Sequence, residues 1–413
     1  MGLSPEPAPA APAVTADRPW LGTVLLVMAA TAVSQGFARF TYAFVLPAMK
    51  DDLLGSYGAA GLLGAANLGA YSLAVLMVTA RPPHSDPARV IKAGLAGSCI
   101  GLLLMTVATT SWMLLVGMCI VGACGALIWI PASGIVAATA PGARRGLAYG
   151  LMIMGVGLGI TLSGLLTGAV QAVRGDGAWR EVWAAVTVIA VLVLLLVGVG
   201  LRPMTTQLTV SVRGWRALRG AFPVARICWC YGFYGIGFSI LVSYLVAGLR
   251  DAGLSSGEAN RAYSLLGLAS IVSAVLLGRL SDHWHRSRTL AGAILVTGLC
   301  AAATTVVAGP GPLTAVAVLF GLVMTGIGSV IAAYLSDELP AVEVTAVLGA
   351  ATLALGLAQF VAPPVGGWLA DRTGSFTVTF LVAGAAQVVS FVLAWTLPST
   401  RAVARLKVTD PSQ

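Results

Sequence analysis

Three polar side chains, Gln35, Arg39 and Tyr42, lie inside an apolar run that begins near Leu21. Their i, i+4, i+7 spacing places an amide, a guanidinium and a phenol on one face of a helix. A guanidinium stays protonated in proteins, and its planar fork matches carboxylate and phosphate groups. This face therefore predicts a binding site for an anionic group.

The position of Arg39 makes it the most informative residue of the chain. An arginine at the centre of a membrane-spanning helix costs roughly 2.5 to 3.5 kcal/mol, so it must face a water-filled cavity or a partner. The long side chain leaves a second interpretation open, because it could snorkel toward Lys50 and Asp51 at the nearer interface. The first interpretation predicts a central cavity, and the second a structural arginine.

Other polar side chains within apolar runs are candidates for the same cavity wall. Each of them could instead hydrogen-bond a neighbouring helix, a common role for such groups within membranes. The candidates are Asn67 and Tyr71 (spaced i, i+4), Tyr231, Tyr234, Ser239 and Gln359.

The remaining chemistry-bearing residues exclude several classes of protein. Every Asp and Glu falls in a tail, a loop or a helix end, which argues against an exporter of organic cations. The six cysteines lie in apolar runs and the three histidines in polar connections, so we expect no metal site and no cofactor. A phosphate-binding loop with a Gly-Lys-Ser/Thr ending is missing, so ATP hydrolysis is not expected.

The composition sets the fold class. The 413 residues are 58% hydrophobic and 9% charged, against roughly 25% charged in soluble domains. The apolar residues suffice for on the order of twelve helices of about 20 residues, each able to cross the bilayer. We therefore expect an all-α membrane protein rather than an enzyme or a nucleic-acid binder.

The apolar runs divide into two sets of six. A linker at 202–223 separates bundles at 20–201 and 224–397, with cytoplasmic tails at 1–19 (disordered) and 398–413. The expected helices lie near 21–47, 58–80, 90–109, 112–139, 147–170 and 181–201, then 224–249, 259–280, 289–308, 313–335, 345–369 and 377–397.

Charge asymmetry predicts the orientation. With the N-terminus in the cytoplasm, 17 Lys and Arg residues lie on the inner side and six on the outer side. Because basic residues are retained on the cytoplasmic side, both termini are expected in the cytoplasm and the protein in the inner (cytoplasmic) membrane.

The two halves also resemble each other. The segment around Gly36 aligns with the segment around Gly235 at an offset of 199 residues. Two parallel six-helix repeats place a substrate site at their interface, near the bilayer midplane. We therefore expect two pseudo-symmetric six-helix bundles.

With twelve spans and a basic central linker, the chain resembles the major facilitator superfamily. Its segments Gly36–Phe40, Gly235–Phe238 and Pro363–Ser375 are similar to those of the superfamily's YbfB/YjiJ-like bacterial group. The turn from Gly278 to Arg288 is similar to the superfamily's loop between helices 8 and 9. That resemblance implies that Asp282 and Arg286 latch helix ends at the cytoplasmic face in one conformation. A better match in letters, from Gly367 to Gly374, falls on the outer side by the charge count.

Together these features predict a secondary transporter that moves a small organic solute by alternating access. Arg39 favours an anionic solute. A drug exporter with an apolar cavity is the alternative, and a membrane sensor or enzyme is a weaker one. The expected partners are a small-molecule substrate, the lipid bilayer, and a coupling proton or counter-anion. A monomer is expected, without nucleic acid.

Overall fold

The computed structural model describes residues 19–80, 86–141, 144–204, 222–339 and 341–398. These residues form helices joined by short connections. In chain order the elements are α1 (Pro19–Thr31), the π-helix η1 (Ala32–Phe37), α2 (Ala38–Met49), the π-helix η2 (Lys50–Leu54), α3 (Tyr57–Ala80), α4 (Pro87–Thr106), α5 (Ser111–Thr139), α6 (Arg145–Arg174), α7 (Trp179–Gly200), α8 (Phe222–Asp251), α9 (Ser256–His283), α10 (Arg286–Val306), α11 (Pro310–Met324), α12 (Gly326–Glu338), α13 (Ala341–Thr373) and α14 (Thr377–Trp395).

The described residues contain 12 helical stretches that are long and apolar enough to cross a membrane. Large apolar side chains cover their outward faces. Leu62, Leu195 and Val199 are 57%, 61% and 91% exposed, a pattern that suits contact with lipid rather than water. The predicted all-α membrane fold is therefore confirmed.

The first span is longer than the sequence predicts. It runs from Trp20 to Leu54, whereas Pro47 and the charges after it indicated an end at residue 47. The helix continues because the N–H of Lys50 bonds to the carbonyls of Leu46 and Pro47, and a π-helical turn follows. Proline removes only one donor, so a local change of hydrogen-bond register is enough to carry the helix past it.

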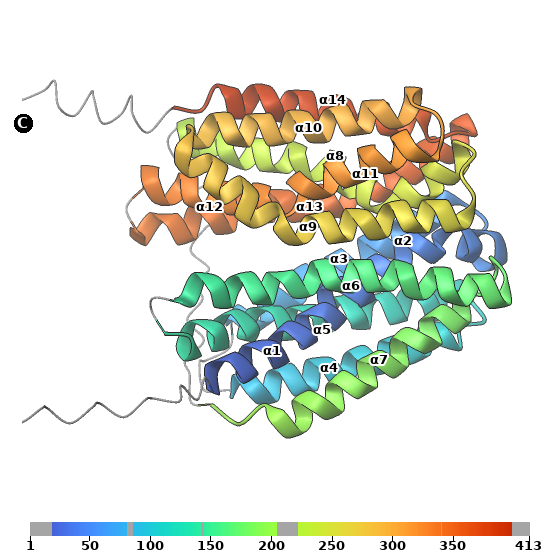
Figure 1. Cartoon of the computed structure of the whole chain (residues 1–413), viewed down its shortest axis with the longest axis horizontal. Helices are drawn as coiled ribbons and strands as arrows, with labels where there is room; N and C mark the ends of the chain where they lie inside the picture. Colours follow the sequence, from blue (N-terminus) through green and yellow to red (C-terminus); the bar gives the residue numbers. More distant parts are fainter. Residues whose placement is uncertain (1–18, 81–85, 142–143, 205–221, 340, 399–413) are drawn as a thin grey trace, which may run out of the picture.

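The helices form two groups, with α1 to α7 in one and α8 to α14 in the other (Figure 1). We call them the N-terminal and C-terminal bundles. Across the boundary, α3 packs on α13, α6 packs on α9, and α2 touches α8. The tails at 1–18 and 399–413 and linker residues 205–221 lie outside the described residues.

The offset of 199 residues reappears in the packing of the two bundles. A Cβ placed on Gly36 would lie 2.6 Å from the Cα of Gly159 on α6. A Cβ placed on Gly235 would lie 3.0 Å from the Cβ of Ala358 on α13. Both members of the second contact follow those of the first by 199 residues, so equivalent helices approach each other at equivalent points.

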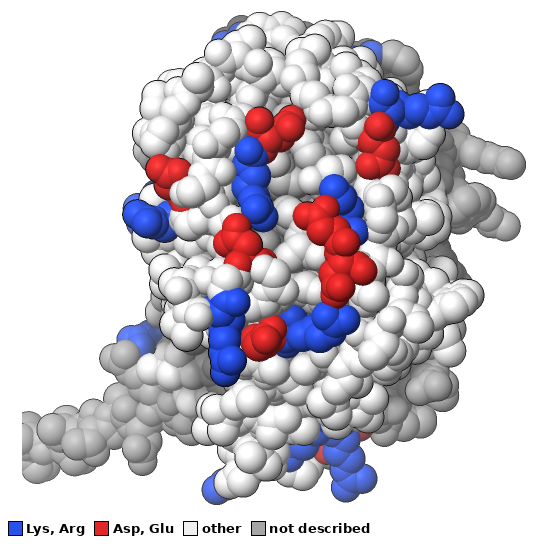
Figure 2. All heavy atoms as spheres, turned by 90° about the vertical axis from the view of Figure 1, so that its right-hand side faces the viewer, with Lys and Arg blue, Asp and Glu red and all other residues white. Residues whose placement is uncertain are grey.

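Charged side chains collect at the ends of the molecule. The first and last described residues lie at the same end, which we call the termini end, and we call the opposite one the distal end (Figure 1). Figure 2 shows acidic and basic side chains interspersed over the distal end. Several are paired there, including Asp52 with Arg180 and Asp176 with Arg250.

Candidate functional site

Arg39 joins the two bundles within the membrane-spanning region. It projects from α2, and its guanidinium donates a hydrogen bond of 3.1 Å to the side-chain oxygen of Gln359 on α13. Arg39 lies near the middle of the span Trp20–Leu54, and Gln359 near the middle of Val347–Thr373. The guanidinium therefore ends at the opposite bundle rather than at the distal interface near Lys50.

The described residues provide no carboxylate for Arg39. Their ion pairs all use other cations, namely Lys50, Arg89, Arg180, Arg250 and Arg286. The guanidinium lies 5.9 Å from the centroid of the Phe40 ring. A guanidinium has five N–H donors, and Gln359 accepts from one of its nitrogens. The others remain available for water or for an anion.

Both helices that form this contact contain prolines. Pro363 and Pro364 lie inside α13, one turn after Gln359. Because proline has no N–H, the carbonyls of Gln359 and Phe360 lose their helical donors. Pro47 in α2 has the same effect on the carbonyl of Ala43. The site is therefore built where unpaired carbonyls and bent helices are expected.

A small cavity of about 40 Å³ lies beside Arg39, between α2, α3, α5 and α8. This volume has room for ordered water but not for an organic solute. An entering solute therefore requires the bundles to move apart. The lining residues are Arg39, Tyr42, Ala43, Gly64, Asn67, Leu68, Met118, Phe238, Ser239, Val242 and Ser243.

Most polar groups of this cavity have partners within the protein. The hydroxyl of Tyr42 donates to the carbonyl of Ala60 (2.5 Å), and Nδ2 of Asn67 donates to the carbonyl of Met118 (3.0 Å). The hydroxyl of Ser239 donates to a carbonyl one turn earlier in α8.

Ser243 differs from these residues, because its hydroxyl has no hydrogen-bond partner among the described residues. Our sequence reasoning missed Ser243. Its i+4 spacing from the polar candidate Ser239 could have indicated it.

Gln35 and Tyr71 contact a different helix. Nε2 of Gln35 donates to the carbonyl of Gly125 on α5 at 3.4 Å. A Cβ at Gly125 would meet that nitrogen at 3.2 Å and the Tyr71 ring at 3.5 Å. Gln35 lies within η1, whose wider turns change the angular spacing assumed for an α-helix. It therefore packs on α5, while Arg39 and Tyr42 line the cavity.

Tyr231 and Tyr234 lie outside the cavity lining. Their rings stack with centroids 5.9 Å apart, and the Tyr234 hydroxyl donates to the carbonyl of Met324 at 3.0 Å. That carbonyl precedes the break between α11 and α12. The break is further satisfied because Thr325 donates to Ser270, and the N–H of Gly326 donates to Ser273. Tyr234 thus stabilises an interrupted helix, and its ring packs against Phe238, which lines the cavity.

Asp282 and Arg286 form an ion pair of 2.6 Å at the termini end. Arg286 also binds Asp337, near the end of α12, with Nε 2.8 Å from Oδ2. The guanidinium therefore connects the turn between α9 and α10 to a third helix end. The sequence pattern did not indicate Asp337, because 51 residues separate it from Arg286.

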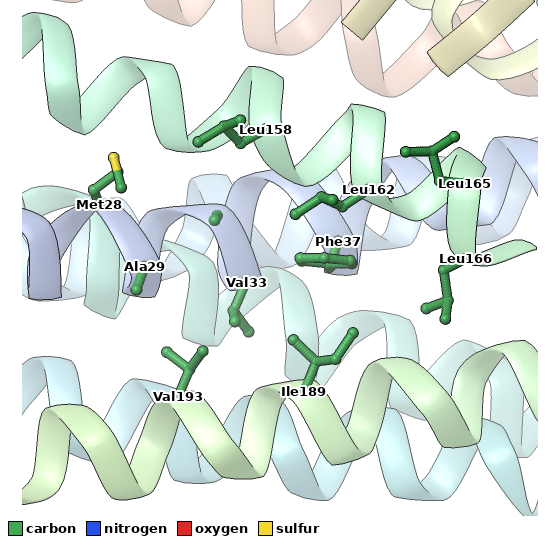
Figure 3. Close-up of a pocket in the computed structure, with 11 residues that line it drawn as sticks. Met28, Ala29, Val33, Phe37, Leu158, Leu162, Leu165, Leu166, Ile189 and Val193 are labelled. Carbon is green, nitrogen blue, oxygen red and sulfur yellow. The ribbon is translucent and has the colours of Figure 1, made fainter. Parts of the chain in front are cut away.

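A larger cavity, of about 470 Å³, lies on another face of the N-terminal bundle. Its lining residues are all apolar and come from α1, η1, α6 and α7 (Figure 3). Leu162 and Leu165 on its rim are 47% and 56% exposed, so it opens toward the lipid. The lining residues are Met28, Ala29, Ala32, Val33, Phe37, Leu158, Leu162, Leu165, Leu166, Ile189 and Val193. It offers no group that could bind an anion.

Metal coordination finds no support in the part of the chain that the structure describes. That part contains no group of three or more His, Cys, Asp or Glu side chains placed to hold an ion. The six cysteines are unpaired and buried or half-buried.

Comparison with known proteins decides the family. Residues 31–395 match the family model described as "Uncharacterised MFS-type transporter YbfB". The chain belongs to this family of major facilitator superfamily transporters. The family supports transport of a solute across a membrane rather than catalysis, and it confirms the predicted resemblance.

Similar curated proteins are transporters as well. The chain is 26% identical over 309 residues to monocarboxylate transporter 12 of Mus musculus, covering 65% of this chain and 62% of that protein. It is 26% identical over 371 residues to monocarboxylate transporter 13 of Bos taurus, covering 88% and 83%. The chain thus spans less than two thirds of the length of the mouse protein.

The fold matches a solved transporter. A bacterial homologue of the human lysosomal transporter Spinster, in an inward-facing and unoccupied conformation, superposes with a TM-score of 0.73. The match covers 92% of this chain and 98% of that one at 16% identity. At this identity the similarity establishes the fold alone.

Proposed function

We propose that this transporter moves a small organic anion, of the carboxylate class, by alternating access between the two bundles. The single observation that carries the proposal is the hydrogen bond between Arg39 and Gln359. It places a permanent positive charge at the boundary between the bundles, near the middle of both spans.

The chemistry of this contact favours an anion. Gln359 is a neutral acceptor, so it compensates little of the charge of Arg39. A carboxylate would accept two parallel hydrogen bonds from the guanidinium and would also cancel its charge. An arriving anion therefore replaces Gln359 with a better partner. The names of the similar monocarboxylate transporters support the same class of cargo.

The contact also suggests how binding is coupled to movement. Arg39 and Gln359 belong to different bundles, and their bond holds these bundles together at the cavity. An anionic cargo that binds the guanidinium of Arg39 breaks the hydrogen bond to Gln359. Ligands shift a conformational equilibrium through such a difference in contacts between states.

The distal contacts support an inward-facing assignment. Hydrogen bonds between described residues of the two bundles lie at Arg39 or nearer the distal end, as for Tyr57 with Asp371 and Asn260 with Gln171. We infer that the distal end is closed in this structure. We assign it to the outer side, because the charge count from the sequence predicts 17 Lys and Arg residues on the cytoplasmic side, where the termini are expected, and six on the other.

We place the protein in the inner membrane, as a monomer with cytoplasmic termini. Every Asp and Glu of the sequence lies in a tail, a loop or a helix end, so the sequence offers no carboxylate within the membrane to relay protons. We therefore propose that transport is driven by a proton carried with the anion or by exchange for a second anion.

We assign Arg286, with Asp282 and Asp337, the role of a latch at the termini end.

Uptake by the purified full-length protein in proteoliposomes tests the proposal. Radiolabelled carboxylates and cationic dyes are compared for the parent protein, for Arg39→Gln and for Arg261→Gln. Arg261 is an exposed arginine outside the cavity, so its substitution serves as the matched control. We expect carboxylate transport to fall at least tenfold in Arg39→Gln only, in line with loss of a charge-assisted pair.

Export of amphipathic drugs is the competing function, and the same assay separates it from the proposal. The large apolar cavity opens toward lipid and does not lie between the bundles, so it provides no path across the membrane (Figure 3). Dye transport that persists in Arg39→Gln, with no carboxylate movement in the parent protein, would reject the anion proposal.

A further inference from the structure

A carboxylate of one bundle binds the start of a helix in the other bundle at the distal end. Asp371, near the end of α13, accepts hydrogen bonds from the backbone N–H groups of Tyr57 and Gly58, both at 2.8 Å. These residues are the first two of α3. The unpaired N–H groups at a helix N-terminus carry partial positive charge, so a carboxylate there is well stabilised.

A second carboxylate makes the reciprocal contact. Asp176 follows α6 in the N-terminal bundle, and it accepts a hydrogen bond from the hydroxyl of Ser256, the first residue of α9. It also pairs with Arg250 at the end of α8, at 3.2 Å. Both partners of the Asp176 carboxylate belong to the C-terminal bundle.

The two contacts occupy equivalent places in the two halves of the chain. Tyr57 and Ser256 are separated by 199 residues, the offset that also relates Gly36 to Gly235. Gly175 and Gly374, which end α6 and α13, are also 199 residues apart. Both have a positive φ, of 89° and 69°. Equivalent helix ends therefore place an acid near the opposite bundle in each half, although Asp371 precedes its glycine by three residues and Asp176 directly follows its own.

A further pair of acids at the distal end makes contacts within single bundles. Asp52 accepts hydrogen bonds from the Trp179 indole and from Arg180, at the start of α7. Asp251, 199 residues later, accepts from the Ser375 hydroxyl and from the N–H of Phe376, just before α14. These acids have the same chemistry as Asp371 and Asp176, but they do not cross the boundary.

We propose that Asp371 and Asp176 form a two-point latch that closes the distal end. Release of both carboxylates from the helix starts of the opposite bundle exposes the Arg39 cavity to that side. This inference rests on the alternating access of the proposed function, and it assigns the residues that control one of its two states. Asp52 and Asp251 hold each bundle together while the latch opens.

The surrounding contacts suit a boundary that opens and closes. The Tyr244 hydroxyl lies 3.1 Å from the carbonyl of Tyr57 and 2.6 Å from that of Pro363, next to Asp371 on the α3–α13 boundary. A Cβ at Gly61 would come within 2.5 Å of the Pro363 carbonyl, so the two helices meet there backbone to backbone. Such a boundary can separate without withdrawing interlocked side chains.

Thiol labelling of the full-length protein tests the latch. Leu68 lines the cavity on α3, so Leu68→Cys reports access to it. A membrane-impermeant maleimide is added to either side of oriented vesicles, and the parent without Leu68→Cys measures labelling of the native cysteines. Asp371→Asn, Asp176→Asn and the double variant are compared with Asp251→Asn, which removes a similar contact within one bundle.

Loss of the latch should raise distal-side labelling. We expect an increase of about tenfold for each single variant, from the loss of a hydrogen-bonded charge, and a larger one for the double variant. Termini-side labelling should fall. Tyr244→Phe, which keeps the ring and removes the hydroxyl, should act in the same direction if an Asp variant fails to fold.

Two results would overturn the latch. One is unchanged distal labelling in the folded double variant, and the other is an equal increase in Asp251→Asn, which would indicate general loosening. The labelling needs no cargo, so it is independent of the anion proposal. If no carboxylate is transported while the latch variants still expose Leu68→Cys, the proposed cargo fails and the latch stands.

Discussion

The guanidinium of Arg39 and the amide oxygen of Gln359 lie 3.1 Å apart, although 320 residues separate them and they belong to opposite bundles. A neutral acceptor thus occupies the place where a carboxylate would bind the guanidinium best. An anionic cargo can therefore replace Gln359 as the partner of Arg39.

Gln359→Glu should inhibit transport more strongly than Gln359→Ala. The glutamate would form an ion pair with Arg39 and hold the bundles together, in competition with an anionic cargo. The alanine removes the competitor and leaves the guanidinium accessible. Initial uptake rates over a range of carboxylate concentrations check this, with a higher KM expected for Gln359→Glu. Equal kinetics in the two variants would contradict a direct competition between Gln359 and cargo.

Ser243→Ala should weaken cargo binding with little effect on folding. Its hydroxyl lines the cavity and has no partner among the described residues, so its removal leaves no protein group unpaired. One lost hydrogen bond corresponds to about a threefold to tenfold increase in KM. Ser239→Ala is the control, because that hydroxyl already bonds to the Ile236 carbonyl. Ligand-dependent thermal stabilisation and uptake provide the measurements, and an unaltered KM for every cargo would exclude contact with Ser243.

Gly36→Ala should destabilise the N-terminal bundle by about 1 to 3 kcal/mol, the usual cost of overpacking. The new Cβ would lie 2.6 Å from the Cα of Gly159, and a backbone atom cannot rotate away. Gly22→Ala is the matched control on the preceding helix, since nothing lies within 4 Å of the added methyl. Thermal unfolding in detergent compares the two variants. Equal melting temperatures would argue against the Gly36–Gly159 contact.

Asp337→Asn should slow transport while changing stability by about 1 kcal/mol or less, as expected for an exposed ion pair. Asp337 binds Arg286, and the substitution would leave Asp282 as the only acid on that guanidinium. Arg288→Ala, at an exposed arginine in the same turn, controls for the loss of charge. Uptake rate and melting temperature are measured together. A large loss of stability without a change in rate would assign the cluster to folding instead of gating.

Parts of this site follow from the sequence because the signal is local. Arg39 stands out as a charge within an apolar run, and Asp282 and Arg286 are one helical turn apart. The partners Gln359 and Asp337 give no such signal, because ordinary polar residues at distant positions meet only after the bundles assemble. The π-helical turn that directs Gln35 to α5 also results from packing, and no sequence motif indicates it.

The segment around Asp371 illustrates a different limit. The motif from Gly367 to Gly374 matches the sequence of the superfamily's cytoplasmic loop, but the charge count predicts that it lies on the outer side of the membrane. The sequence could therefore indicate only that the motif does not have its usual cytoplasmic location. Its contact with the first residues of α3 depends on the approach of the two bundles, and the equivalent contact of Asp176 became recognisable only through the structure.

The amino-acid sequence by itself determined the membrane fold, the number of spans and the helix that carries the buried charge, because hydropathy and a misplaced arginine act over single helices. Tertiary structure alone decided which neutral side chain meets that arginine and which acids join the bundles at the distal end. Those pairings depend on how two rigid groups of helices dock, and docking geometry is a property of the whole surface between them rather than of any one segment.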